Sequence, residues 1–331
     1  MSETALVIGG TRFIGRHTVI ELLEHGYEVA MMNRGNHDNP FRDDVRVTHI
    51  EGDRTDPQAL RRAGRSADPD IVIDCVAYHP DDVRTATNVF ADVDGYVYVS
   101  SGSSYEVEAI PKREGETPLC SCTRDQATDD SRDTYGNRKA EGDRAVFAAA
   151  EDGVNAMAVR PCIVYGPYDY TERLDYWINR VLTHDQIVVP GDGQNIWQRA
   201  YVADVASALR IVAERGEPGT AYNVGDRRAL TLEETIETIA DAADTTCQVV
   251  TASADALAAG GLTPDDFILY RAYPHLLDTC SLASLGWEST PVDAAMERTV
   301  EEHRESDRDG SEWDPGREAE KRVLGVKETL S

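Results

Sequence analysis

The sequence Ala-Leu-Val-Ile-Gly-Gly-Thr-Arg-Phe-Ile-Gly, residues 5–15, places a short apolar run directly before a glycine turn. The apolar run predicts a buried strand, and the residues after the turn, up to His25, have the spacing of a helix. Free N–H groups in such a turn, and the dipole of the helix that it opens, attract phosphate. Because a second strand pattern follows at residues 28–32, the segment predicts a strand–turn–helix–strand unit that binds the pyrophosphate of a dinucleotide.

Apolar runs alternate with helical patterns through the first half of the chain. The predicted strands are residues 5–8, 28–32, 45–50, 70–76, 95–100 and 154–160, and the predicted helices are 13–25, 57–63, 81–90 and 135–151. This alternation is typical of a parallel sheet with helices on both faces. We therefore expect an α/β protein with a Rossmann-type, doubly wound parallel sheet, whose ligands bind beyond the carboxyl ends of the strands.

The pattern becomes less regular after Pro161. Helices are predicted over 173–183, 201–214, 232–243 and 292–304, and short strands near Ile187, Trp197 and 221–224. We expect three parts: a dinucleotide-binding domain (1–160), a mixed segment that returns to the sheet and forms a smaller C-terminal substrate lobe (161–300), and an acidic C-terminal tail (301–331). The charge of the tail predicts a solvated segment or a peripheral helix.

Lysine is rare in this chain. Only four of the 33 lysine and arginine residues are lysines, and one of them ends the stretch Tyr135-Gly136-Asn137-Arg138-Lys139. A Tyr and a Lys four residues apart project from the same face of a helix. There the ammonium can lower the pKa of the phenol from about 10 toward neutrality, which makes the tyrosine a usable general acid and base. An amphipathic helix can carry this pair by chance, so its meaning depends on the motifs around it.

Several such motifs occur in order along the chain. They are Ser100-Ser101-Gly102-Ser103-Ser104-Tyr105, then Arg160-Pro161-Cys162-Ile163-Val164-Tyr165-Gly166-Pro167, then Tyr201-Val202-Ala203-Asp204-Val205. With the glycine turn and the Tyr135–Lys139 pair, they resemble the extended short-chain dehydrogenase/reductases, also called the NAD-dependent epimerase/dehydratase family. The resemblance runs from about residue 6 to residue 300. The form of the glycine turn is similar to that of an atypical branch that includes the chloroplast stem-loop-binding proteins.

This resemblance implies roles for individual residues. Ser101 would hydrogen-bond the substrate oxygen, Tyr135 would transfer its proton, and Lys139 would support that transfer and bind the nicotinamide ribose. The implied cofactor-binding residues are Gly9, Gly10, Arg12, Phe13, Ile14, Gly15, Asn33, Arg34, Asp53, Arg54, Val76, Ala77, Tyr135, Lys139, Pro161 and Ile163.

The choice between NAD and NADP depends on the end of the second strand. An acid there binds the ribose hydroxyls of NAD, whereas an arginine accommodates the 2′-phosphate of NADP. This chain has Asn33 and Arg34 at that place, and Arg12 lies in the glycine turn. The pattern favours NADP over NAD, with the alternative that Arg12 only covers the turn.

Three departures from the family's pattern bear on the substrate. Nucleotide-sugar enzymes of the family have an Asn at the position of Ile163 and a diphosphate-binding Arg at that of Trp197; Arg199 could replace the latter. Dehydratases have Asp-Glu directly after the catalytic hydroxyl, where this chain has Gly102 and Ser103. Dehydration is therefore disfavoured, and a sugar or nucleotide sugar is the expected small-molecule substrate.

Composition limits the setting of the protein. The formal net charge is −27, and the acidic residues are spread along the whole chain, which indicates adaptation to high salt more than a surface for one basic partner. Such a surface argues against nucleic-acid binding. The six cysteines have no metal-ligand spacing, so no metal site is expected, and reduced thiols fit a cytoplasmic protein. No apolar run reaches the length of a membrane span.

These observations lead to one main expectation and two alternatives. We expect an NAD(P)-dependent sugar epimerase in which Tyr135 acts as acid and base during transient hydride transfer. The same three residues would also serve an NADPH-dependent carbonyl reductase. The stem-loop-binding resemblance leaves a non-catalytic, NAD(P)-binding regulatory or RNA-associated protein as the alternative of another class. A homodimer is expected from the family alone.

Overall fold

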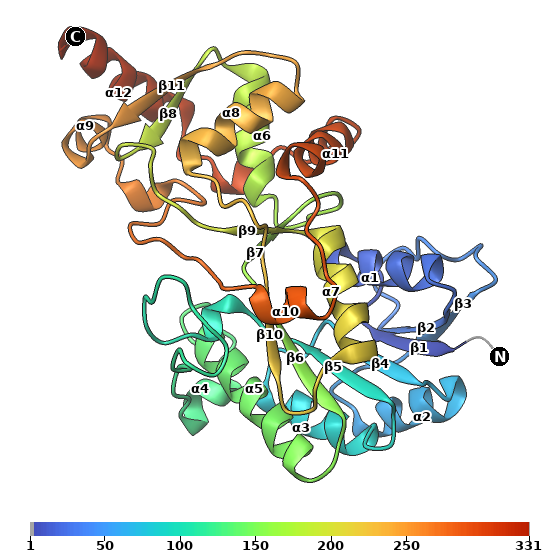
Figure 1. The fold of residues 1–331 in the computed structure, drawn as a ribbon. Coiled ribbons are helices and arrows are strands. Elements are labelled where there is room, and N and C mark those ends of the chain that lie inside the picture. The colour runs from blue at the N-terminus through green and yellow to red at the C-terminus, as the bar shows by residue number, and fades with distance from the viewer. Residues whose placement is uncertain (1–2, 331) are drawn as a thin grey trace. The chain divides into compact units, whose positions relative to one another are not determined.

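The computed structural model describes residues 3–330, with side chains through residue 326 (Figure 1). The described chain forms two compact units. The first comprises the chain up to Val164, then Val202–Gly225 and Leu277–Ser289; the second comprises Tyr165–Tyr201, Asp226–Leu276 and the chain from Thr290 onward. The chain therefore returns twice to its first unit after leaving it, once for a helix and a strand and once for a short segment.

The first unit is built on a parallel sheet of seven strands in the order β10-β6-β5-β4-β1-β2-β3. The strands are β1 (Thr4–Ile8), β2 (Glu28–Asn33), β3 (Val47–Glu51), β4 (Ile71–Asp74), β5 (Gly95–Val99), β6 (Ala156–Pro161) and β10 (Ala221–Val224). The strand order reverses direction between β1 and β4, which is the point where such sheets bind their ligands. The expected α/β class and Rossmann-type sheet are confirmed.

Helices cover both faces of this sheet. On one face α1 (Phe13–Glu24) packs against α7 (Val202–Arg215); the other face carries α2 (Pro57–Ala67), α3 (Pro80–Val89) and α5 (Tyr135–Glu151) (Figure 1). The short helices of the unit are α4 (Arg124–Thr128) and α10 (Cys280–Ser284). Helix α5 begins at Tyr135, so both residues of the expected Tyr–Lys pair lie on one helix.

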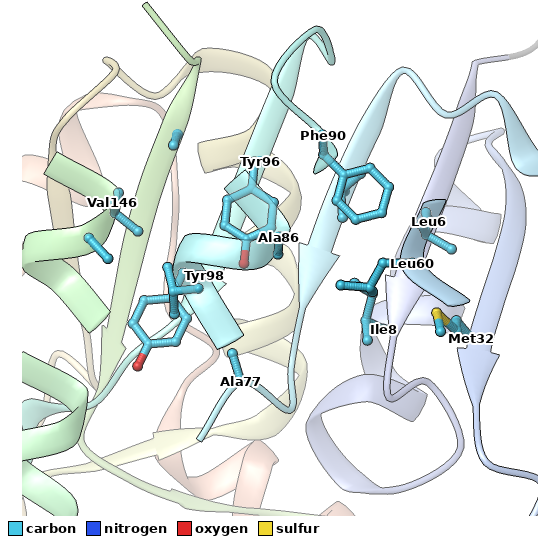
Figure 2. Packing of buried hydrophobic residues seen from close by; sticks show 14 of the residues in the cluster. Leu6, Ile8, Met32, Leu60, Ala77, Ala86, Phe90, Tyr96, Tyr98 and Val146 are labelled. Atoms are coloured by element: carbon cyan, nitrogen blue, oxygen red, sulfur yellow. The ribbon is translucent and has the colours of Figure 1, made fainter. Parts of the chain in front are cut away.

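The core under α2, α3 and α5 is formed by alternate residues of neighbouring strands (Figure 2). Leu6 and Ile8 of β1 lie beside Met32 of β2, because every second side chain of a strand points to the same face. Tyr96 and Tyr98 of β5 belong to the same layer and are almost fully buried. Their hydroxyl groups bring polar atoms into an otherwise apolar layer directly below the carboxyl end of the sheet.

The second unit consists of helices around a small parallel pair of strands, β8 (Gln186–Pro190) and β11 (Gln248–Ala252). Its helices are α6 (Arg173–Thr183), α8 (Leu232–Ala242), α9 (Ala254–Gly260), α11 (Val292–Arg304) and α12 (Arg317–Leu330), and the short strands β7 (Ile163–Tyr165) and β9 (Arg199–Tyr201) lie at its boundary in the sequence. The strand expected near Trp197 begins two residues later, at Arg199. Trp197 itself makes a single β-bridge with His275.

The expected acidic tail contains a packed helix. Glu320 of α12 is 1% exposed, and its carboxylate accepts hydrogen bonds from Tyr176, Arg180 and Arg317. Val323, one turn later, is fully buried. The charge of the tail predicted a solvated segment or a peripheral helix; α12 is a helix, and its acidic side chains include one that neutralises arginines inside the unit. None of the helices within residues 3–330 is long and apolar enough to cross a membrane.

Candidate active site

The glycine turn between β1 and α1 brings backbone against backbone. A Cβ atom at Gly15 would lie 2.0 Å from the carbonyl oxygen of Gly9, so no other residue fits at this position. The close contact places the first turn of α1, formed by Phe13, Ile14 and Gly15, at the carboxyl edge of β1. Helix N-termini attract anions through their N–H groups, and this turn therefore has the form of a phosphate cradle.

Polar residues follow the neighbouring strands β2 and β3. The Asn33 side chain accepts hydrogen bonds from the backbone N–H of Gly35 (2.8 Å) and pairs with His49 (3.0 Å). Arg34 is exposed, and Asp53 after β3 is exposed as well. Hydrogen bonds from Thr55, with smaller contributions from Arg34 and Arg54, lower the pKa of Asp53. An arginine and an ionised aspartate therefore lie at adjacent strand ends.

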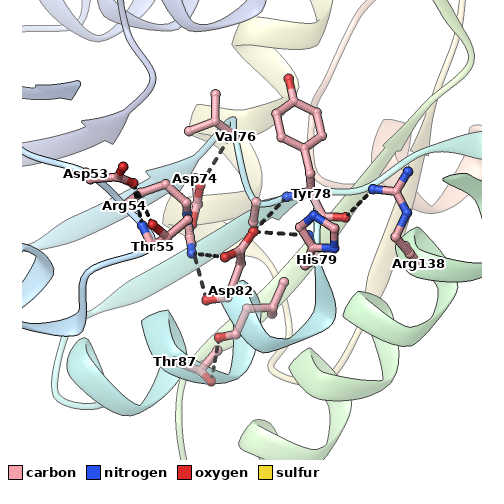
Figure 3. Close-up of polar contacts among 12 residues, drawn as sticks. Asp53, Arg54, Thr55, Asp74, Val76, Tyr78, His79, Asp82, Thr87 and Arg138 are labelled. Carbon is pink, nitrogen blue, oxygen red and sulfur yellow. Dashed lines mark hydrogen bonds and ion pairs between the residues drawn. The ribbon is translucent and has the colours of Figure 1, made fainter. Parts of the chain in front are cut away.

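Arg54, which follows Asp53 in the chain, is buried, whereas Asp53 is exposed. Its guanidinium is 8% exposed and forms ion pairs with Asp74 at the end of β4 and with Asp82 in α3 (2.9 Å to Asp82) (Figure 3). It also donates to the backbone oxygen of Asp82 (3.2 Å). These contacts link the loop after β3 to β4 and α3, and the role of Arg54 in binding the cofactor stays a prediction.

The residues after β4 lie close to the glycine turn. A Cβ at Gly9 would lie 2.5 Å from Val76 Cγ1, which shows how near Val76 is to the turn. The Val76 N–H donates to Asp74 Oδ1 (3.2 Å), and Ala77 is fully buried. Two strands away in the sheet, Pro161 is the last residue of β6, and Ile163 is the first residue of β7. The expected residues Val76 and Ala77 thus lie at the point where the strand order reverses.

Ser101 follows β5 and caps a short 3-10 helix, Gly102–Ser104. Its Oγ accepts a hydrogen bond from the Ser103 N–H (3.1 Å). The 3-10 helix packs closely on the start of α5, because a Cβ at Gly136 would lie 2.4 Å from the carbonyl oxygen of Ser103. This contact brings the Ser101 segment next to Tyr135 in the first turn of α5.

Lys139 lies in the interior beside the ends of two strands. Its side chain is 2% exposed, and Nζ donates to the carbonyl oxygens of Ala77 (2.9 Å) and Val99 (2.8 Å). Burial lowers the pKa of Lys139 to about 8, although nearby carboxylates oppose this shift. Near neutral pH the lysine therefore remains a cation but loses its proton far more easily than a lysine in water.

Aromatic rings surround this ammonium. The distances from Nζ to the ring centroids are 4.8 Å for Tyr98, 5.3 Å for Tyr78 and 5.8 Å for Tyr135. Tyr98 is buried below the ammonium, whereas Tyr135 is partly exposed and Tyr78 is 43% exposed. The partly exposed ring of Tyr135 thus lies beside a buried cation, the arrangement expected where a tyrosine acts as general acid and base.

Tyr78 is not among the residues predicted from the sequence. It follows Ala77 in the loop after β4, and its ring faces the same ammonium as Tyr135. Its backbone oxygen accepts a hydrogen bond from Arg138 (3.1 Å), which ties the loop to α5 (Figure 3). The sequence did contain an indication of this role, because an aromatic residue shortly after a buried strand of a parallel sheet lies at the ligand-binding edge.

Two of the positions expected to bear on the substrate, Trp197 and Arg199, lie in the second unit. Trp197 is covered by the guanidinium of Arg271, 5.4 Å from the ring centroid, and its ring lies near His275. Arg199 is 5% exposed and donates to Thr235 Oγ1 (2.6 Å). Arg199 is therefore part of the interior of this unit, whereas Arg271, which the sequence had not singled out, brings a positive charge to Trp197.

Within residues 3–330 there is no group of three or more His, Cys, Asp or Glu residues arranged to hold a metal ion. The cysteines in this part of the chain are all free thiols. Burial raises the pKa of the Cys75 thiol, next to the site, to about 12. This thiol is therefore not a nucleophile at neutral pH.

A family model matches the first two thirds of the chain. Residues 5–94 and 83–225 match the model of the NAD dependent epimerase/dehydratase family. The chain belongs to this family. Its members are in general enzymes of the oxidoreductase type, built as extended short-chain dehydrogenase/reductases. The glycine turn, the Ser101 segment and the Tyr135–Lys139 helix all lie in the matched region.

Individual relatives are distant. The chloroplast stem-loop binding protein of 41 kDa b of Arabidopsis thaliana is 25% identical over 69% of this chain, and the match spans only 60% of that protein. A low-salt glycan biosynthesis protein of Haloferax volcanii is 27% identical over 86% of this chain and 92% of its own length. The resemblance to the chloroplast branch is thus confirmed, while a halophilic origin of this family member stays a prediction.

Solved structures share the fold. The UDP-glucose 4-epimerase of Thermotoga maritima, solved with UDP-glucose, has a TM-score of 0.72 at 20% identity and covers 91% of this chain and 99% of its own. The dTDP-glucose 4,6-dehydratase of Bacillus anthracis, solved in complex with NAD, has a TM-score of 0.72 at 19% identity, covering 94% and 98%. At these identities the likeness establishes the architecture of both units and leaves the reaction open.

The burial of Lys139 predicts a pH-dependent cost in stability. Folding lowers the pKa of Lys139 from 10.5 to about 8, so between these values the unfolded chain binds a proton that the folded chain does not. The stability of the wild type relative to Lys139→Met should therefore be constant below pH 8. It should rise between about pH 8 and pH 10.5 by up to about 3 kcal/mol.

Denaturant unfolding of both proteins across this range would test the expectation. Lys321→Met serves as the control, because the Lys321 side chain is 59% exposed and its ammonium stays in solvent. A flat difference for Lys139→Met would mean that the ammonium is hydrated in the folded protein.

Proposed function

We propose that the protein is an NAD(P)-dependent epimerase that acts on a sugar, and specifically on a nucleotide sugar. The observation that supports this most strongly is the buried Lys139 ammonium beside the partly exposed ring of Tyr135, at the carboxyl edge of the sheet. Membership of the NAD dependent epimerase/dehydratase family also supports the proposal, because its relatives include nucleotide-sugar epimerases and dehydratases.

Each of three residues has a task in this proposal. Tyr135 takes a proton from a substrate hydroxyl and returns it at the end of the cycle. Lys139 stabilises the phenolate through its charge, and its two hydrogen bonds to strand carbonyls fix the position of Nζ. Ser101, whose Oγ is held at the start of the 3-10 helix, donates to the same substrate oxygen.

The residues at the strand ends fit a dinucleotide. The glycine turn, whose backbone packs on itself at Gly15, opens a helix whose first N–H groups would bind the phosphates, and Asp53 would accept hydrogen bonds from the adenine end. When bound, the nicotinamide group would accept a hydride from the substrate carbon and return it to the opposite face. Val76, Ala77, Pro161 and Ile163 would line the walls of the same site.

The substrate side favours epimerisation over dehydration. Gly102 and Ser103 follow Ser101 where a dehydratase needs carboxyl groups to remove water from the sugar. Arg271 over Trp197 offers a cation for a phosphorylated substrate, in place of the arginine missing at position 197. A simple reductase would use the same Ser101, Tyr135 and Lys139, and differs only in releasing its cofactor after each turnover.

The phenol of Tyr135 gives the sharpest test of the chemistry. Tyr135→Phe should lower kcat by at least about a hundredfold, because a general acid and base is lost, while cofactor affinity stays within about threefold. Steady-state kinetics with UDP-glucose and UDP-galactose, together with cofactor titration, measure both quantities. Tyr273→Phe, which removes an exposed phenol from the second unit, is the matched control; equal activity of the two variants would contradict the mechanism.

Retained cofactor separates the epimerase from its alternatives. We expect protein purified in high salt and then denatured to release close to one equivalent of NAD(H) or NADP(H), identified by mass spectrometry, because an epimerase regenerates its cofactor internally. An empty protein that takes up NADPH reversibly would favour the reductase. A protein that binds neither dinucleotide would favour the non-catalytic alternative.

Arg34 should decide between the two cofactors. Arg34→Ala is expected to weaken NADP⁺ binding by about tenfold, the effect of one exposed phosphate contact, and to change NAD⁺ binding little. Calorimetric titration of both dinucleotides measures the difference, with Arg42→Ala, another exposed arginine of the first unit, as control. An equal loss for NAD⁺ and NADP⁺ would overturn the expected NADP preference.

A further inference from the structure

Two buried carboxylates flank Lys139, and the proposed proton transfer assigns a role to neither. Asp143 lies one helical turn after Lys139 on α5, so both side chains project from the same helix face. Asp74 ends β4, three residues before Ala77, whose carbonyl accepts a hydrogen bond from the ammonium. Both carboxylates are fully buried.

Each carboxylate has its own buried arginine. Arg54 pairs with Asp74, and Arg160 Nε donates to Asp143 Oδ2 at 2.9 Å. The Arg160 side chain also donates to the Tyr105 hydroxyl (2.9 Å), which in turn donates to Asn223 (2.8 Å). A buried carboxylate without a cation is strongly unfavourable, so the arginines make it possible to keep these charges inside the fold.

The pairing of Asp143 is incomplete. Its second oxygen, Oδ1, is buried and has no hydrogen-bond partner among the described residues. Tyr98 lies against α5 beside both residues. Its ring is 4.8 Å from Nζ of Lys139, and its hydroxyl would be 2.5 Å from a Cβ at Gly142, next to Asp143. Arg160 therefore satisfies one oxygen of Asp143 and leaves the other without a hydrogen bond, while Lys139 is the cation on the same helix face.

We infer that Asp74 and Asp143 are positioning residues for Lys139. Their two negative charges hold the buried ammonium protonated and hydrogen-bonded beside Tyr135. The electrostatics agree with this geometry. Burial lowers the pKa of Lys139, and Asp74 and then Asp143 are the largest charges that raise it again. The other groups that act on the ammonium include Arg138, which lowers this pKa, Asp82, which raises it, the Cys75 thiol, and the rings of Tyr78, Tyr98 and Tyr135.

The kinetic consequence rests on the proposed function. If one carboxylate loses its charge, the ammonium loses its proton at a lower pH. Tyr135 then has no cation beside it, and activity falls on the alkaline side. The alkaline limb of the profile of kcat/KM against pH should therefore move to lower pH in Asp143→Asn and further in Asp74→Asn, with KM for the substrate nearly unchanged.

The charge of Lys139 can be measured without any activity. The chain has only four lysines, so protein labelled with ¹³Cε-lysine should give four resonances, and Lys139→Arg assigns one of them. In Asp143→Asn, the titration midpoint of the Lys139 resonance should fall by about one pH unit, the effect of removing a nearby opposite charge. Asp74→Asn should shift it at least as much, and Asp143→Glu, which keeps the charge, should restore most of the wild-type midpoint.

A buried aspartate elsewhere serves as the control. Asp175 is 4% exposed and pairs with His303 and Arg308 in the second unit. Asp175→Asn should cost comparable stability and leave the Lys139 titration where it is. An unchanged midpoint in folded Asp143→Asn or Asp74→Asn, shown by circular dichroism to be native, would overturn the inference. Shifted midpoints in a protein that catalyses no epimerisation would leave the inference standing and contradict the proposed function instead.

Discussion

The burial of one ammonium group, that of Lys139, constrains the architecture around the site. A charge in the interior must be met by polar atoms, and here the carbonyl oxygens of Ala77, in the loop after β4, and of Val99, the last residue of β5, supply them. The loop after β4 must therefore lie beside the end of β5, and α5 must lie close enough for its lysine to reach both. Gly136 makes this approach possible, since any side chain there would collide with the Ser101 segment.

The same burial connects stability with chemistry. An ammonium exposed to water costs little free energy when it is charged, but water screens its charge, so it acts only weakly on a neighbouring phenol. In the interior its field is stronger, and its proton is held less tightly, with a pKa of about 8. Burying this group costs folding free energy, and in the proposed mechanism the same group makes Tyr135 reactive, a compromise that is common where function needs a strained or desolvated group.

Arginine and lysine have different tasks in this protein. Buried carboxylates such as Asp74, Asp143 and Glu320 are paired with arginines, whose planar guanidinium forms several hydrogen bonds at once and keeps its charge. The rarity of lysine did not by itself identify the site, because Lys112 is equally buried and pairs with Glu108. What distinguishes Lys139 is the set of tyrosine rings and carbonyls around it, a property of the fold.

The sequence by itself determined the β1–turn–α1 unit, the parallel sheet and the helix that begins at Tyr135. Those features depend on local periodicity, on glycine, and on residues a few positions apart. Only the tertiary structure decided that Arg54 pairs with Asp74, that Tyr78 faces Lys139, that Arg271 covers Trp197, and that the acidic tail contains a packed helix. Each of these contacts joins residues that are far apart in the chain, and burial, not sequence spacing, determines which charged groups meet.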